Sequence, residues 1–161
     1  MAVDYFLDLE GCPGESEDSA KSKQIQLDSW DWSEAQTASS SSGGGGGSGK
    51  VKMEDFEFTC KIGTHSPKLM VKCASGEHIK KGTLTARKAG KTPQDFLKVT
   101  FTDLLISSYS VGGSVNDEGL PNDKCKFNFA KIEFQYKAQQ ADGTLGGAIT
   151  ASYDLKKSVA S

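Results

Sequence analysis

Short runs in which every second residue is apolar constrain the fold of this chain most strongly. Polar or charged residues fill the alternate positions, and turn-forming residues separate the runs. Because side chains of a strand point alternately to its two faces, each run predicts a half-buried β-strand, and many such strands predict an antiparallel sandwich or barrel. The apolar positions of the clearest runs are Tyr5, Leu7 and Leu9; Phe56, Phe58, Cys60 and Ile62; Leu97, Val99 and Phe101; Ile132, Phe134 and Tyr136; Ile149, Ala151, Tyr153 and Leu155.

Two runs change parity along their length. Ile25 and Leu27 are odd-numbered, whereas Trp30 and Trp32 are even-numbered, and a similar change occurs within 127–136. A strand that changes parity contains a bulge or passes from one sheet to another. Both tryptophans alternate with polar neighbours, so we expect them in the core rather than on a sugar-binding surface.

One segment departs from the strand pattern and predicts a short helix. Ser66 is a suitable capping residue, Pro67 suits the first helical position, and Gly76 suits the end of the helix. The side chains expected on its buried face are Leu69, Met70 and Cys73.

The tract from Ser39 to Gly49 contains only serine and glycine and has no side chain that could anchor a core. Strand-like sequence lies on both sides, and the residues before it are too few for a separate domain. We therefore expect residues 1–161 to form one mainly β domain, a compact antiparallel β-barrel or sandwich with one short α-helix and a long, mobile Gly/Ser-rich loop at 39–50.

Composition argues against several classes of function. The net charge is −2, and the nearest basic clusters, Lys80–Lys81 and Arg87–Lys88, are too short for a nucleic-acid footprint. No stretch approaches the length of apolar sequence that crosses a membrane, and the residues after Met1 lack the pattern of a signal peptide. These features predict no nucleic-acid partner, no membrane insertion and synthesis in the cytosol.

The four cysteines predict neither a disulfide framework nor a redox motif, because they are widely spaced and form no C-x-x-C pair. Cys60, His65, Cys73 and His78 form two C-x4-H pairs, but this spacing matches no common zinc site, so incidental placement is favoured. With two histidines and no nucleophile elbow, phosphate loop or H-E-x-x-H motif, the chain is expected to have no catalytic residues and no metal or other cofactor.

Several segments together resemble the hemolysin-coregulated protein (Hcp) family of bacterial type VI secretion. No single segment is diagnostic, but their ordered combination covers nearly the whole chain. The matching segments are 1–8, 13–16, 29–32 with the glycine run that follows, 49–51, 66–69, 76–78, 85–90, 128–132 and 137–143.

The resemblance implies a β-barrel flanked by one helix, six copies of which form a ring, and rings that stack into a tube. A contractile sheath would propel this tube out of the cell, without a signal peptide, together with a spike protein and effector proteins. The alternative is a secreted β-sandwich that binds a carbohydrate or a protein.

Within such a ring, polar strand positions opposite the tryptophans would face the lumen and its cargo: Ser29, Asp31 and Ser33. Asp31 departs from the family pattern, in which serine is frequent, so it predicts a changed cargo preference. Candidates for contact between stacked rings are Ser42, Gly43, Gly44, Gly45, Gly46, Gly47, Ser48, Gly49 and Lys50.

Overall fold

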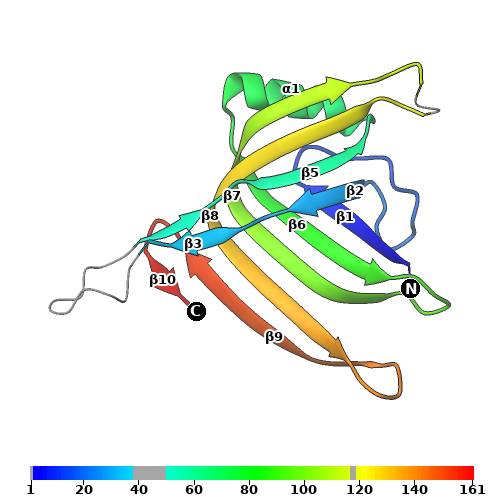
Figure 1. Cartoon of the computed structure of the whole chain (residues 1–161), viewed down its shortest axis with the longest axis vertical. Coiled ribbons are helices and arrows are strands. Elements are labelled where there is room, and N and C mark those ends of the chain that lie inside the picture. The colour runs from blue at the N-terminus through cyan, green and yellow to red at the C-terminus, as the bar shows by residue number, and fades with distance from the viewer. Residues whose placement is uncertain (1, 38–49, 117–118) are drawn as a thin grey trace, which may run out of the picture.

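Antiparallel strands dominate the computed structural model, which describes residues 2–37, 50–116 and 119–161 (Figure 1). The strands are β1 (Val3–Leu9), β2 (Ile25–Asp31), β3 (Glu34–Gln36), β4 (Val51–Met53), β5 (Phe56–Lys61), β6 (Ile79–Lys88), β7 (Gln94–Gly112), β8 (Asn122–Gln139), β9 (Leu145–Asp154) and β10 (Val159–Ala160). The helix α1 spans His65–Ser75.

Six of these strands close into a barrel in the order β8-β5-β2-β1-β6-β7, and pairing of β7 with β8 completes the circle. The prediction of a barrel or sandwich with a single short helix is thereby confirmed in its barrel form. Closure gives each of these six strands a hydrogen-bonded neighbour on both sides.

Aromatic rings fill the barrel. The ring centroids of Phe56 and Phe101 each lie 5.0 Å from that of Phe127, and Phe129 packs 4.9 Å from Phe101. Trp30 is only partly buried but stacks on Phe56 from the rim, and Trp32 contacts Phe129. The two tryptophans thus border the core rather than fill it.

Strand β8 belongs to two regions. Its first part, Asn122–Phe127, pairs with β5 inside the barrel, whereas Lys131–Gln139 pairs with β9. We call this second part, with β9 and β10, the wing, which extends beyond the barrel in Figure 1. The parity change within 127–136 occurs where β8 exchanges β5 for β9 as its partner. On the neighbouring strand β7, Asp103 lies at the same level and has a φ of +57°.

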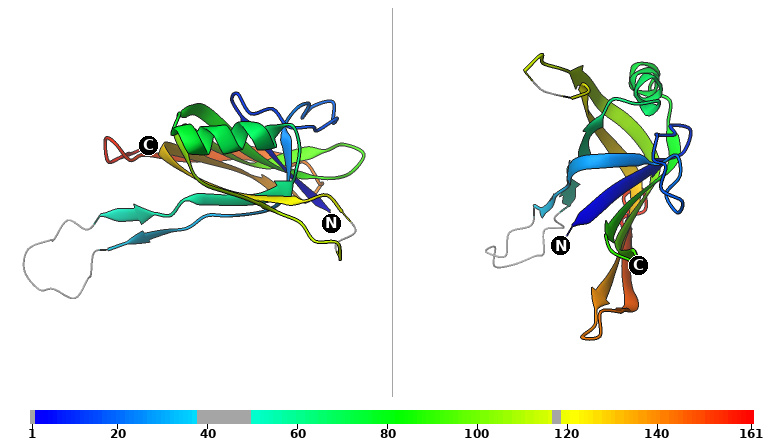
Figure 2. Two further views of the ribbon diagram at one scale, coloured as in Figure 1. Left: turned by 90° about the horizontal axis from the view of Figure 1, so that it is seen from above. Right: turned by 90° about the vertical axis from the view of Figure 1, so that its right-hand side faces the viewer.

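The other parity change has a different cause. The pairing of β2 with β5 shifts register between Leu27 and Ser29, which is the bulge that the sequence allowed. Beyond β2, strands β3 and β4 form a hairpin that projects from the barrel (Figure 2). Thr37 and Lys50 join its two arms, since the Thr37 hydroxyl donates to the Lys50 carbonyl and accepts from the Lys50 amide, each at 3.0 Å.

Helix α1 packs against β7 and sends Leu69 into the core. Two details of the predicted helix are wrong. It begins before Ser66, with Thr64 at the N-cap position, because the Ser66 hydroxyl is engaged by Asp123 and by the Gly63 amide. Met70 is 50% exposed rather than buried, and Cys73 is partly buried.

Arg87 on β6 binds Asp18, which lies in the segment between β1 and β2. The guanidinium of Arg87 donates two hydrogen bonds to the Asp18 carboxylate, at 2.9 and 2.7 Å, and it also lies over the ring of Phe6. Arg87 is therefore buried and paired, and it does not extend a basic surface with Lys80 and Lys81.

Candidate functional site: a polar sheet face and an apolar groove

The outer faces of β2, β5, β8 and β7 form one polar surface, which we call the polar face. Register aligns its side chains in rows across the strands, because residues opposite one another in antiparallel strands share a face. The two central rows are Ser29, Thr59, Lys124 and Ser110, and Asp31, Glu57, Lys126 and Ser108.

Charges on the polar face are only partly balanced. Asp31 lies directly opposite Glu57, and like charges in this arrangement repel. Glu57 is compensated by Lys124 at 2.9 Å and Lys126 at 3.9 Å. Such exposed ion pairs contribute little to the stability of the fold. The acidic residues near Asp31 are therefore not explained by a role in stabilising the subunit.

The structure brings the three predicted lumen residues to this surface. Asp31 and Ser33 line one hollow, together with the carboxylates of Glu54, Asp55 and Glu57. Ser29 lies one row away and pairs with the Thr59 hydroxyl at 2.5 Å. Their shared surface is as predicted, whereas its position toward a lumen stays a prediction.

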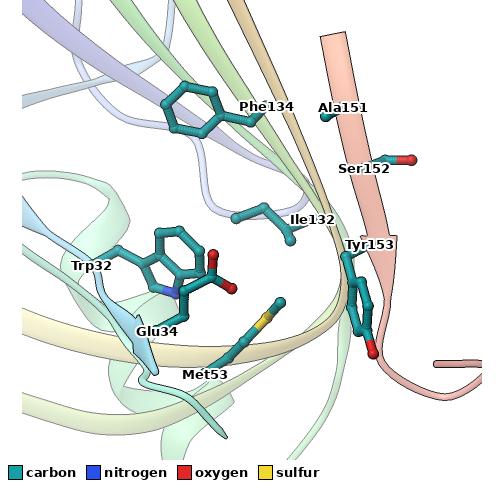
Figure 3. A pocket seen from close by; sticks show the side chains of 8 residues that line it. All are labelled: Trp32, Glu34, Met53, Ile132, Phe134, Ala151, Ser152 and Tyr153. Carbon is teal, nitrogen blue, oxygen red and sulfur yellow. The ribbon is translucent and has the colours of Figure 1, made fainter. Parts of the chain in front are cut away.

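A second surface feature is an apolar groove of about 380 Å³ between the wing and the β3–β4 hairpin (Figure 3). In that view Phe134 and Ile132 project from β8, Tyr153 from β9, and Trp32 and Met53 face them from the other side, while Ser152 points away. Glu34 and Ala151 complete the lining.

Apolar exposure continues from the groove along the wing. Phe134 is 42% exposed, Tyr136 45% and Ile149 74%, and Tyr136 lies opposite Ile149 in the register. The sequence predicted these residues as the buried sides of strands, and that prediction is wrong for the isolated subunit. A contiguous apolar patch of this kind marks a surface that contacts another molecule.

The candidate stacking residues Ser42–Gly49 lie outside the described residues. Lys50 is exposed and directly precedes β4. Thr37 and Lys50, the described residues that flank 38–49 in the sequence, contact each other on a hairpin that projects from the barrel (Figure 2).

The two C-x4-H pairs, for which the sequence favoured incidental placement, do not form one cluster in the described residues. Cys60 and His65 lie together in the core. Asp123 lies beside them, and the sequence spacing gave no sign of this third residue. His78 instead pairs with Asp103 at 2.7 Å on the surface, and this contact lowers the pKa of the Asp103 carboxyl. All four cysteines are free thiols.

Comparison with known proteins identifies the family. A family model described as type VI secretion system effector, Hcp, matches residues 6–136. The chain belongs to the Hcp family. Protein Hcp1 of Pseudomonas aeruginosa is 42% identical over 161 residues, which cover 99% of both chains.

Solved structures of Hcp proteins share the fold. The crystal structure of Hcp1 from Salmonella typhimurium superimposes with a TM-score of 0.81 at 34% identity, with 100% of both chains covered. A structure described as a type six secretion system protein gives a TM-score of 0.92 at 23% identity, over 99% of this chain and all of that one. Hcp proteins are secreted tube proteins of the type VI system that form oligomeric rings.

Within residues 2–37, 50–116 and 119–161, no helix has the length and hydropathy needed to span a bilayer.

Proposed function

We propose that six copies of this chain close into a ring, that the rings stack into the inner tube of a type VI machine, and that the lumen carries effector proteins. The tube would be made in the bacterial cytoplasm and exported with its spike by the contractile sheath, into the medium or a target cell. This proposal assigns no catalytic step to the chain.

The division between the polar face and the apolar groove carries the proposal. A closed ring of identical subunits uses heterologous contacts, in which each subunit presents two different patches. The groove and the exposed apolar side chains of the wing supply one such patch, because a neighbouring subunit would cover them. The polar face supplies a surface that can remain hydrated and line a channel.

The state of the purified protein in solution tests ring formation. Native mass spectrometry and electron microscopy should show closed rings of six subunits with a central channel. A secreted carbohydrate- or protein-binding module, the alternative, should remain a monomer. Monomer alone across micromolar concentrations would contradict the ring.

Asp31 is proposed to influence the choice of cargo. Repeated around a ring, its carboxylate would give a circle of negative charge, with Asp55 beside it in the same hollow, whereas Glu57 there is balanced by Lys124 and Lys126. Charges on a surface facing a confined space act over about 8 Å at physiological ionic strength, so cargo with basic patches would be favoured.

The variant Asp31→Gln should preserve folding and ring formation but lower the amount of cargo that co-purifies and is exported. Its control is Glu17→Gln, which also removes one exposed carboxylate per subunit but lies outside the polar face. Equal cargo recovery with wild-type and Asp31→Gln rings would show that this position does not select cargo.

Stacking of rings is assigned to the segment 42–50. Because most of its residues are glycine, any contact that it makes on stacking is offset by the entropy of ordering it, which favours a tube that can disassemble. This assignment rests on the sequence and on the projection of the β3–β4 hairpin.

A further inference from the structure

Three side chains that commonly bind metals converge in the core beside α1. Cys60 comes from β5, His65 is the first residue of α1 and Asp123 comes from β8, and they are 0%, 4% and 1% exposed. The Nε2 atom of His65 lies 3.3 Å from Cys60 Sγ and 3.3 Å from Asp123 Oδ2. The three potential ligand atoms all lie within 4.8 Å of one another.

These separations suit a small tetrahedral ion. With zinc bonds of about 2.3 Å to sulfur and about 2.0 Å to nitrogen or oxygen, tetrahedral angles place neighbouring ligand atoms about 3.3 to 3.5 Å apart. Both contacts of His65 fall at this spacing. A neutral imidazole nitrogen offers either one proton or one lone pair, so Nε2 cannot satisfy a thiol and a carboxylate equally.

The fold fixes the position of each group. Cys60 and Asp123 lie directly opposite each other in the pairing of β5 with β8. Gly63 leaves space for the imidazole, because a Cβ atom at that position would lie 2.9 Å from His65 Cε1. Asp123 is oriented by the hydroxyls of Ser66 and Tyr109, which donate to its two oxygens at 2.5 and 2.8 Å.

Asp123 is a buried carboxylate, and few groups near it can balance its charge. His65 is the only basic side chain within ion-pair distance of Asp123 in the part of the chain that the structure describes. The other contacts of its carboxylate are the hydroxyls of Ser66 and Tyr109, and a buried carboxylate held mainly by neutral groups is costly.

The cluster borders a surface hollow through His65. His65 lines a hollow whose wall also contains Glu15, Asp28 and Lys61. Asp28 is paired with Lys61 at 3.2 Å, so Glu15 supplies the negative charge that attracts cations to this hollow.

We propose that Cys60, His65 and Asp123 form a structural site for one borderline-soft divalent cation of the zinc type. The Ser66 hydroxyl or a water molecule would complete the tetrahedron. On binding, Cys60 loses its proton to solvent and the sulfur forms the bond to the metal, so that thiolate, carboxylate, imidazole and a dication give a site without net charge. The ion links β5, α1 and β8 and stabilises the subunit.

The test uses protein without an affinity tag, freed of metal with a chelator and then titrated with Zn²⁺ and with Co²⁺. Wild-type protein should bind one equivalent per subunit, unfold at a higher temperature with Zn²⁺, and show thiolate-to-cobalt charge-transfer absorption with Co²⁺. Cys60→Ser should lose that absorption and bind at least about 100-fold more weakly. The matched control Cys125→Ser removes another buried thiol outside the cluster and should retain both properties.

Asp123→Asn provides a second variant that keeps a side chain of the same shape, should Cys60→Ser fail to fold, and it should also weaken binding. The proposal is overturned if the wild type binds no stoichiometric metal. It is equally overturned if Cys60→Ser or Asp123→Asn retains wild-type affinity with the same cobalt spectrum. Ring formation does not enter this test, so its outcome is independent of the proposed assembly.

Discussion

Strand β8 passes through two environments, and the same apolar alternation has opposite outcomes in them. Inside the barrel Phe127 is fully buried and Phe129 is 7% exposed, whereas in the wing Phe134 is 42% exposed and Tyr136 45%. The barrel covers its own apolar face because six strands close around it. Among the described residues, no second layer covers Phe134, Tyr136 and Ile149 of the wing, and alternation alone cannot distinguish the two cases.

The largest expected loss of subunit stability follows from a substitution in the barrel part of β8. Phe127→Ala removes a ring that contacts Phe56 and Phe101, and it should lower the free energy of unfolding by about 3–5 kcal/mol. Urea denaturation, below the concentration at which rings form, measures this. Phe134→Ala on the same strand is the control and should cost less than about 1 kcal/mol. Similar losses for both would show that the wing belongs to the core.

The converse change on the wing should break assembly without unfolding the subunit. Ile149→Asp places a charge on the exposed apolar face, and loss of a central contact costs about 2 kcal/mol or more at each interface. Sedimentation velocity should then show monomers with an unchanged circular dichroism spectrum. Thr150→Asp, whose side chain points to the opposite face of β9, should still form rings. If Ile149→Asp still forms intact rings, the wing is not part of the interface between subunits.

A smaller effect is expected from the glycine run in the sequence between β3 and β4. Deleting Gly43–Gly47 should leave the subunit and the ring intact but reduce tube length in electron micrographs, because glycine contributes no side chain to a core. Replacing the same five glycines by serine keeps the length of the segment and serves as the control. Failure of the deletion variant to fold would mean that this segment supports the subunit itself.

The smallest effect concerns the outer wall of the barrel and depends on pH. The Arg87 hydrogen bonds hold the pKa of Asp18 at about 2, below its ordinary value. The contact therefore stabilises the segment between β1 and β2 above about pH 4 and is lost as pH falls toward 2. Hydrogen exchange of residues 12–24 should accelerate over that interval. Asp18→Asn should show no such acceleration, and an equal response in both proteins would assign it to another group.

Much of the fold could be predicted from local pattern. The alternating runs locate the strands, Pro67 and Gly76 locate the helix, and the parity change before Trp30 locates a bulge. These signals depend on neighbouring residues, which a sequence displays directly. Family resemblance added the closed barrel, and the comparisons confirmed it. That residues 1–161 form a single domain stays a prediction.

The remaining features depend on contacts between distant residues. Asp123 lies 63 positions after Cys60, and only the pairing of β5 with β8 brings them together. The same aspartate engages Ser66, so the helix starts earlier than its sequence indicated. The exposure of Ile149 depends on which layer covers the wing, and a residue's own neighbours in sequence do not contain that information.

The buried thiols of the barrel bear on the passage of this protein between compartments. Cys12 and Cys125 are 1% and 0% exposed, and burial raises the pKa of each. Oxidants attack the thiolate, so cysteines that stay protonated and covered react slowly. A subunit exported as proposed would pass from a reducing compartment to an oxidising one while these two cysteines remained unreactive thiols. Its fold would then need no change of covalent state between assembly and delivery, and a tube built inside the cell would meet the exterior as the same molecule.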